Sequence, residues 1–116
     1  METDRQPLIN RDFLQTTFGD DPEFIQELLQ LYVQDAQARL AALQQASVSL
    51  NWGQIQHEAH QLKGASANVG ATAIQNLART LEELAAAQQE PERVRELIQT
   101  LAQSVQQIKR EVGVNV

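Results

Sequence analysis

The sequence predicts an all-α protein, an antiparallel up-down four-helix bundle with a short extra helix near the N-terminus. Two observations lead to this fold class. Four apolar stripes at helical spacing occupy most of the chain, and the three prolines and five glycines lie mostly between these stripes or at their ends. Four amphipathic helices joined by short connections can bury their stripes only against one another, which favours the bundle.

The first two expected helices lie in the N-terminal half. Residues 10–14 predict a short helix, and its apolar side chains include Phe13. The second helix begins at Asp21, a good N-cap residue, which is followed by proline and glutamate in the first turn. Its stripe, which runs to about Ser47, consists of Ile25, Leu28, Leu29, Tyr32, Val33, Ala36, Leu40 and Leu43.

Three further helices complete the predicted bundle. Asn51 is the expected N-cap of the third helix, with Gln54 placed for a capping box, and Gly70 is its expected end. The fourth helix carries an apolar face of Ala71, Ile74, Leu77, Ala78, Leu81 and Leu84. The fifth begins at Pro91 and ends at Gly113, and its stripe consists of Val94, Leu97, Ile98, Leu101, Val105, Ile108 and Val112.

Composition narrows the class of protein. A chain of 116 residues predicts one domain over residues 1–116. The formal net charge of -6 makes nucleic acid an unfavourable partner. The chain has no cysteine, and no apolar run approaches the roughly 20 residues that a membrane span requires. The N-terminus lacks a signal-peptide pattern, so we expect a cytoplasmic protein without a membrane partner.

The third helix carries the residues that are best suited to take part in a reaction. At 100° per residue, one face consists of Ile55, Ala59, Leu62, Ser66 and Val69, which we expect in the core. The opposite face consists of Gly53, Gln56, His57, His60, Lys63, Gly64 and Ala67. His60 should therefore point away from the bundle, with Lys63 one turn later on the same side.

This arrangement suits a nucleophile that must carry an anion. An exposed imidazole is largely neutral near pH 7, because its ordinary pKa is about 6.5. Lys63 would hold a phosphoryl group as a point charge. Gly64 weakens the helix by about 1 kcal/mol relative to alanine, yet it leaves space beside the histidine for that group and for a partner surface.

The run His60-Gln61-Leu62-Lys63-Gly64, with Gly70 ten residues after the histidine, closely resembles the signature of histidine-containing phosphotransfer (HPt) domains. The resemblance covers most of the chain and includes residues 67–71 and the Leu81-Glu82 pair. It implies that His60 is the phosphorylated residue and that Lys63 and Gly64 have the roles given above. It also implies that Glu82 lies close to the histidine.

The same resemblance implies a function. The chain would be a phosphohistidine carrier in a multistep His-Asp phosphorelay, which accepts a phosphoryl group from a receiver-domain aspartyl phosphate, or from a kinase, and passes it to another receiver aspartate. Its partners would be response-regulator receiver domains and a hybrid sensor histidine kinase. It would act as a monomer and as a stoichiometric intermediate, not as an enzyme. It would need no cofactor of its own, since the magnesium ion belongs to the receiver.

The expected docking surface surrounds His60 and consists of Gln56, His57 and Ala67, with Phe13 as a further contact from the N-terminal segment. His57 and His60 are three residues apart, which differs from the four-residue spacing of HExxH zinc sites, and we predict no metal site. His57 is also a weaker candidate for the phosphoryl acceptor. Glu82 has an alternative role as a surface acid that pairs with Arg79 or with nothing.

The sequence is also compatible with two other functions of the whole chain. A helical-bundle adaptor could bind receiver domains without phosphotransfer. The chain could also be the phosphoacceptor region of a larger kinase, although Met1 and the closed set of helices favour a free-standing protein.

Overall fold

The computed structural model of the chain describes residues 7–113. Residues 1–6 and 114–116, which the single-domain prediction also includes, lie outside this range. The described residues form five helices and no strand: α1 (Arg11–Phe18), α2 (Pro22–Val48), α3 (Trp52–Asn68), α4 (Thr72–Ala87) and α5 (Pro91–Val112). The all-α class predicted from the sequence is therefore confirmed.

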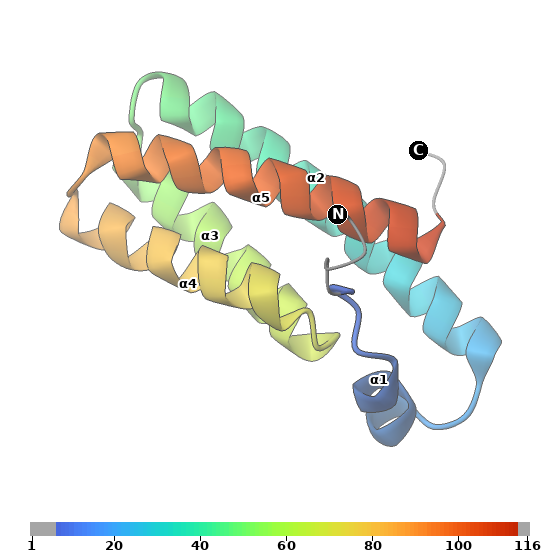
Figure 1. Ribbon diagram of the computed structural model, residues 1–116. Helices are drawn as coiled ribbons and strands as arrows, with labels where there is room; N and C mark the ends of the chain where they lie inside the picture. Colours follow the sequence, from blue (N-terminus) through green and yellow to red (C-terminus); the bar gives the residue numbers. More distant parts are fainter. Residues whose placement is uncertain (1–6, 114–116) are drawn as a thin grey trace.

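Helices α2 to α5 form the bundle, and each runs in the opposite direction to the helix before it (Figure 1). Each packs against its neighbour in sequence, and α2 also packs against α5, which closes the bundle. Helix α1 contacts α2 and lies beyond one end of the bundle, near the turn between α3 and α4 (Figure 1). This is the antiparallel four-helix bundle with an additional N-terminal helix.

Two of the predicted helix starts, those of α2 and α3, are made by side-chain caps. Asp21 Oδ1 accepts the N–H of Phe24 at 3.1 Å, and Asn51 Oδ1 accepts the N–H of Gln54 at 3.1 Å. Each bond satisfies one of the amide groups that a helix leaves unpaired at its N-terminus. The short first helix extends to Phe18, four residues beyond the expected range.

The turn between α3 and α4 depends on Gly70. Its φ is +71°, in the left-handed region that favours glycine. The ring of Phe13 lies where a side chain would be, because a Cβ on Gly70 would be 2.5 Å from Phe13 Cδ2. Gly70 therefore permits both the turn and the close approach of α1.

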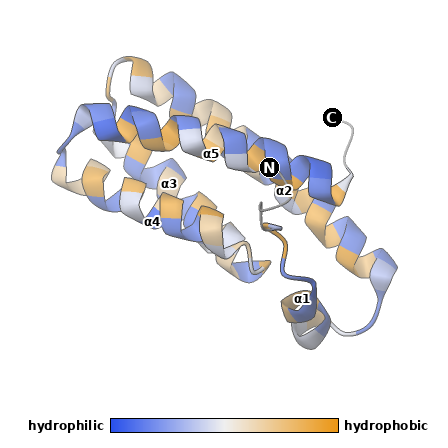
Figure 2. Cartoon of the chain, viewed as in Figure 1, coloured by the Kyte–Doolittle hydropathy of each residue, from blue (hydrophilic) through white to orange (hydrophobic). Residues whose placement is uncertain are grey.

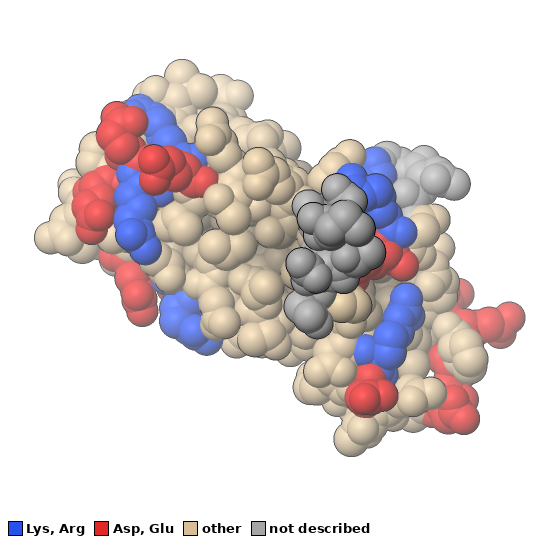
Figure 3. All heavy atoms as spheres, in the orientation of Figure 1, with Lys and Arg blue, Asp and Glu red and all other residues tan. Residues whose placement is uncertain are grey.

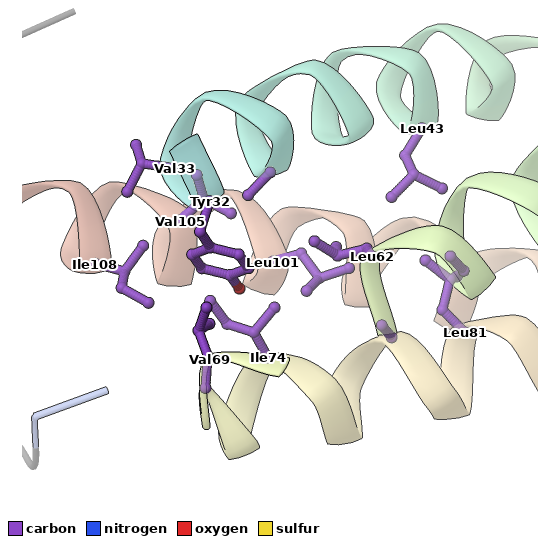
Figure 4. Close-up of a cluster of buried hydrophobic side chains, with 14 of the residues drawn as sticks. Tyr32, Val33, Leu43, Leu62, Val69, Ile74, Leu81, Leu101, Val105 and Ile108 are labelled. Carbon is purple, nitrogen blue, oxygen red and sulfur yellow. The ribbon is translucent and has the colours of Figure 1, made fainter. Parts of the chain in front are cut away.

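The core lies between α2, α3, α4 and α5. The buried side chains of these helices are almost all apolar. Hydrophobic and hydrophilic residues alternate along each helix (Figure 2), and side chains from all four helices meet around Tyr32 (Figure 4). Every residue of the predicted stripes is buried or partly buried. The hydroxyl groups of Tyr32 and Ser66 are 2.7 Å apart within this core, and burial raises the pKa of Tyr32 to about 12.

The N-terminal segment is tied to the far end of the chain by Glu111 on α5. Leu8 N–H donates to both carboxylate oxygens of Glu111 at 2.9 Å, and Ile9 N–H donates to Oε1 at 3.0 Å. The side chain of Ile9 is buried in the core. These contacts hold the segment that leads into α1 across the end of the bundle.

The surface carries charges of both signs. Figure 3 shows acidic and basic side chains beside one another near both ends of the face it presents, with a mostly uncharged stretch between them. This mixed pattern gives that face no extended field of one sign. No helix within residues 7–113 has the length and apolar character needed to cross a bilayer.

Candidate functional site

His60 lies midway along α3 on the side that faces solvent. Its side chain is 58% exposed. The four core residues predicted within α3, which are Ile55, Ala59, Leu62 and Ser66, are fully buried on the opposite side. The division of this helix into two faces is therefore confirmed, and the ring is accessible to a partner.

The nearest charged group to His60 comes from the neighbouring helix α4. Glu82 Oε2 lies 2.8 Å from His60 Nδ1, and Glu82 Oε1 lies 2.7 Å from Lys63 Nζ. One carboxylate thus bridges the imidazole and the ammonium group. Arg79, the alternative partner for Glu82, donates instead to Asn76 Oδ1 at 2.7 Å.

The environment of Glu82 keeps it ionised. Burial alone would raise the pKa of this carboxyl, but hydrogen bonds from Lys63 and His60, together with their charges, lower it below the ordinary value of 4.5. An ionised carboxylate can only accept hydrogen bonds. His60 Nδ1 must therefore carry the proton in this contact, which leaves the lone pair of the neutral ring on Nε2.

Gly64 leaves the helix surface open beside the histidine. It is exposed, and apart from its two chain neighbours and the backbone of its own helix, no described atom lies within 4 Å of the position that a Cβ would occupy. An open groove of about 420 Å³ adjoins it, lined by Asp35, His60, Gln61, Gly64, Ala65 and Asn68. A phosphoryl group or a partner side chain can approach His60 along this groove.

The α2 side of the groove is formed by a residue that the sequence did not identify. Asp35 lines it and pairs with Arg39 at 3.4 Å, and Arg39 also pairs with Glu58 of α3 at 3.1 Å. Leu31, one turn before Asp35 on α2, is 63% exposed. A leucine outside the apolar stripe of its helix was the available signal for this surface.

The other expected contact residues lie at different distances from the histidine. Gln56 and His57 are exposed about one turn before His60, and Ala67 is partly buried two turns after it. Phe13 is partly buried against Gly70 at the end of the bundle. Phe13 therefore lies at the turn that follows α3, whereas His60 lies midway along that helix.

The geometry of the site offers a nucleophile and a cation. Within the part of the chain that the structure describes, no group of three or more His, Cys, Asp or Glu residues could hold a metal ion. His60, Lys63 and Glu82 are instead joined directly by hydrogen bonds. Such a site offers an anion both a nucleophile and a cation.

The sequence matches the family model of the Hpt domain over residues 27–111, well over half of the 116-residue chain. The match includes His60, Lys63 and Glu82 and leaves out α1 with Phe13. No curated protein and no solved structure matches the chain significantly. The helical bundle, the exposed histidine and the family match agree, and the chain belongs to the Hpt domain family.

Proposed function

We propose that His60 Nε2 is the phosphoryl acceptor of a carrier that serves a multistep His-Asp phosphorelay. The contact between Glu82 and His60 Nδ1 is the observation that carries this proposal. It fixes the proton on Nδ1 and leaves Nε2 with its lone pair on an accessible ring. A positioned nucleophile of this kind is what phosphoryl transfer from a second protein requires.

The reaction begins with an aspartyl phosphate on a receiver domain. The Nε2 lone pair attacks phosphorus, the bond from phosphorus to the aspartyl oxygen breaks, and the aspartate leaves as a carboxylate. Nδ1 keeps its proton throughout, so the phosphorylated ring is cationic beside Glu82. Attack by the carboxylate of a second receiver reverses these bond changes and returns the electron pair to Nε2.

Lys63 and Gly64 support this transfer in different ways. The Lys63 ammonium group lies one helical turn from His60 and can turn from Glu82 to the phosphoryl oxygens, where it balances their negative charge. Gly64 admits the phosphoryl group because nothing occupies the space beside it. Both residues act on the phosphoryl group that the ring carries.

The receiver docks on the face around His60. Gln56, His57 and Ala67 form its α3 part, and Leu31 adds an exposed apolar contact from α2. Phe13 would be reached only by a partner that extends to the end of the bundle. The carrier acts stoichiometrically, as a cytoplasmic monomer, and the magnesium ion and aspartate are supplied by the receiver.

The test uses receiver domains from the same genome, each labelled with ³²P on its aspartate. Label should move to the wild-type chain and to His57→Gln, but not to His60→Gln, and it should be labile in acid and stable in alkali. A wild-type chain that binds receivers without accepting label would support an adaptor instead. Label on His57→Gln and His60→Gln alike would place the acceptor elsewhere.

A further inference from the structure

Glu82 brings a negative charge to His60 that is not needed to hold the imidazole ring in place. A neutral amide of the same shape could also accept a hydrogen bond from Nδ1–H and fix the same tautomer. The carboxylate adds a negative charge, with one oxygen 2.8 Å from the ring nitrogen. That charge favours a positively charged ring, and the ring becomes positively charged when Nε2 is phosphorylated while Nδ1 keeps its proton.

The proton on Nδ1 decides how easily the bond between phosphorus and nitrogen breaks. When Nδ1 is protonated, the ring leaves as neutral imidazole. When Nδ1 is not protonated, the ring must leave as an imidazolate anion, which is a much poorer leaving group. The fraction of phosphorylated ring that is protonated therefore sets the rate at which the phosphoryl group is lost to water or to a partner.

We propose that the negative charge of Glu82 keeps Nδ1 of the phosphorylated ring protonated and so makes the phosphoryl group on His60 readily transferable and short-lived. This inference rests on the proposed function, since His60 must carry the phosphoryl group. Glu82 acts through the ring and is a positioning residue. The structure supports this assignment because the same carboxylate touches both the ring and Lys63.

Lys63 controls how much of this charge the ring receives. In the unphosphorylated protein, its ammonium group pairs with Glu82 Oε1 and partly neutralises the carboxylate. A phosphoryl group on Nε2 draws the ammonium toward its own oxygens. The full charge of Glu82 then acts on the ring at the stage when a cationic ring favours release.

Other charged groups face the ring less directly. His57 is exposed one turn earlier on α3, and Asp35 of α2 lines the same groove but is paired with Arg39 at 3.4 Å. Among the groups that the structure describes around His60, Glu82 is the acid that hydrogen-bonds the ring. His57 and Asp35 are present in the wild type and in variants at position 82 alike, so their effects cancel in a comparison between these proteins.

The test compares the wild type with Glu82→Gln and with Glu83→Gln. The second variant is a matched control, because it removes the same charge from the next residue of α4, whose side chain is exposed. Each protein is phosphorylated with phosphoramidate, which needs no receiver. Loss of the phosphoryl group to water is then followed by ³¹P NMR between pH 5 and pH 9. In this loss, water attacks phosphorus and the electron pair returns to Nε2, which yields inorganic phosphate.

We expect Glu82→Gln to lose its phosphoryl group about tenfold more slowly than the wild type at pH 8. The rate of loss follows the protonated fraction of the ring, and that fraction falls about tenfold when the midpoint of ring protonation moves down by about one pH unit. The difference should vanish near pH 5, where the ring is protonated in both proteins. Glu83→Gln should follow the wild type at every pH. Nδ1 of the phosphorylated ring, followed by ¹⁵N NMR, should lose its proton at lower pH in Glu82→Gln.

Equal lifetimes of the wild type and Glu82→Gln across the range would overturn the inference and leave the proposed function intact. A slower loss by the same factor at all pH values would also overturn it, because a purely structural role predicts that parallel change. The proposed function would fail separately if phosphoramidate labelled His60 but no receiver exchanged label with the wild-type chain.

Discussion

Lys63 and Glu82 form an ion pair between adjacent helices, with Lys63 Nζ 2.7 Å from Glu82 Oε1. The other oxygen of the same carboxylate contacts His60 Nδ1 at 2.8 Å. The cation proposed to hold the phosphoryl group therefore already has a partner in the unphosphorylated protein. Under the proposed function, an incoming phosphoryl group would compete with Glu82 for this cation, so the pairing of Lys63 would depend on whether the histidine is phosphorylated.

Substitution Lys63→Ala should slow phosphoryl transfer by about tenfold, equivalent to about 1.4 kcal/mol in the barrier, because the charge of the phosphoryl group loses its nearest cation. The fold should be retained, since partly exposed ion pairs contribute only about 0–1 kcal/mol. Rapid-quench transfer from a labelled receiver, with circular dichroism, checks both. As a control, Lys109→Ala removes the other lysine of the chain, on α5, and should accept the phosphoryl group at the wild-type rate. A loss of helicity in Lys63→Ala would contradict the placement of Lys63 at the surface.

Gly64→Ala and Gly70→Ala should change stability in opposite directions. Gly64 is helical with open space around it, so alanine should raise the free energy of unfolding by about 0.5–1 kcal/mol while the added methyl group slows transfer. At Gly70, alanine meets a positive φ and the Phe13 ring, so it should lower stability by at least about 1–2 kcal/mol. Urea denaturation of both variants measures the difference. Stabilisation by Gly70→Ala would mean that the turn is not constrained as the structure indicates.

The buried hydroxyl pair of Tyr32 and Ser66 should show strong coupling. Ser66→Ala leaves the Tyr32 hydroxyl buried without its partner, which should lower stability by about 1–3 kcal/mol. Adding Tyr32→Phe removes that unsatisfied group, so the double variant should be less destabilised than the sum of the single variants. Thermal and urea unfolding of the four proteins of this cycle measure the coupling. Strict additivity would show that the two hydroxyl groups do not bond in solution.

Stability should depend on pH through Glu82. Its pKa in the folded protein lies below the ordinary value of 4.5, so the unfolded chain binds the proton more readily. The resulting stabilisation is present above pH 4.5 and is lost as the pH falls through the lower folded value. The wild type should therefore unfold at higher urea than Glu82→Gln at pH 7, and this advantage should shrink by pH 3. Glu83→Gln, measured in the same way, should show no comparable dependence on pH.

Glu111 should control the order of the N-terminal segment. In Glu111→Ala, the amides of Leu8 and Ile9 lose their acceptor, so their hydrogen exchange should accelerate. Amides in the middle of α3 should exchange at rates that reflect only the loss in overall stability. Unchanged protection of Leu8 and Ile9 would show that burial of the Ile9 side chain alone holds the segment in place.

The sequence by itself determined the four helices of the bundle, the starts of three of them at Asp21, Asn51 and Pro91, and the outward direction of His60. These properties are local, because the helical period assigns each residue to a face and a cap acts within its own first turn. The relation of Lys63 to His60 was predictable for the same reason. Proximity of Glu82 to the histidine came from resemblance to the family and not from the periodicity of its own helix.

Only the tertiary structure decided which groups meet between helices. The sharing of Glu82 between His60 and Lys63, the position of Asp35 beside the groove and the packing of Phe13 against Gly70 each depend on the rotation and axial offset of one helix relative to another. Many side chains across the whole interface set that rotation and offset together. A change of one residue in the offset between two helices would move a contact such as that of Glu82 by about 1.5 Å, which is enough to break a hydrogen bond while leaving every apolar stripe facing the core.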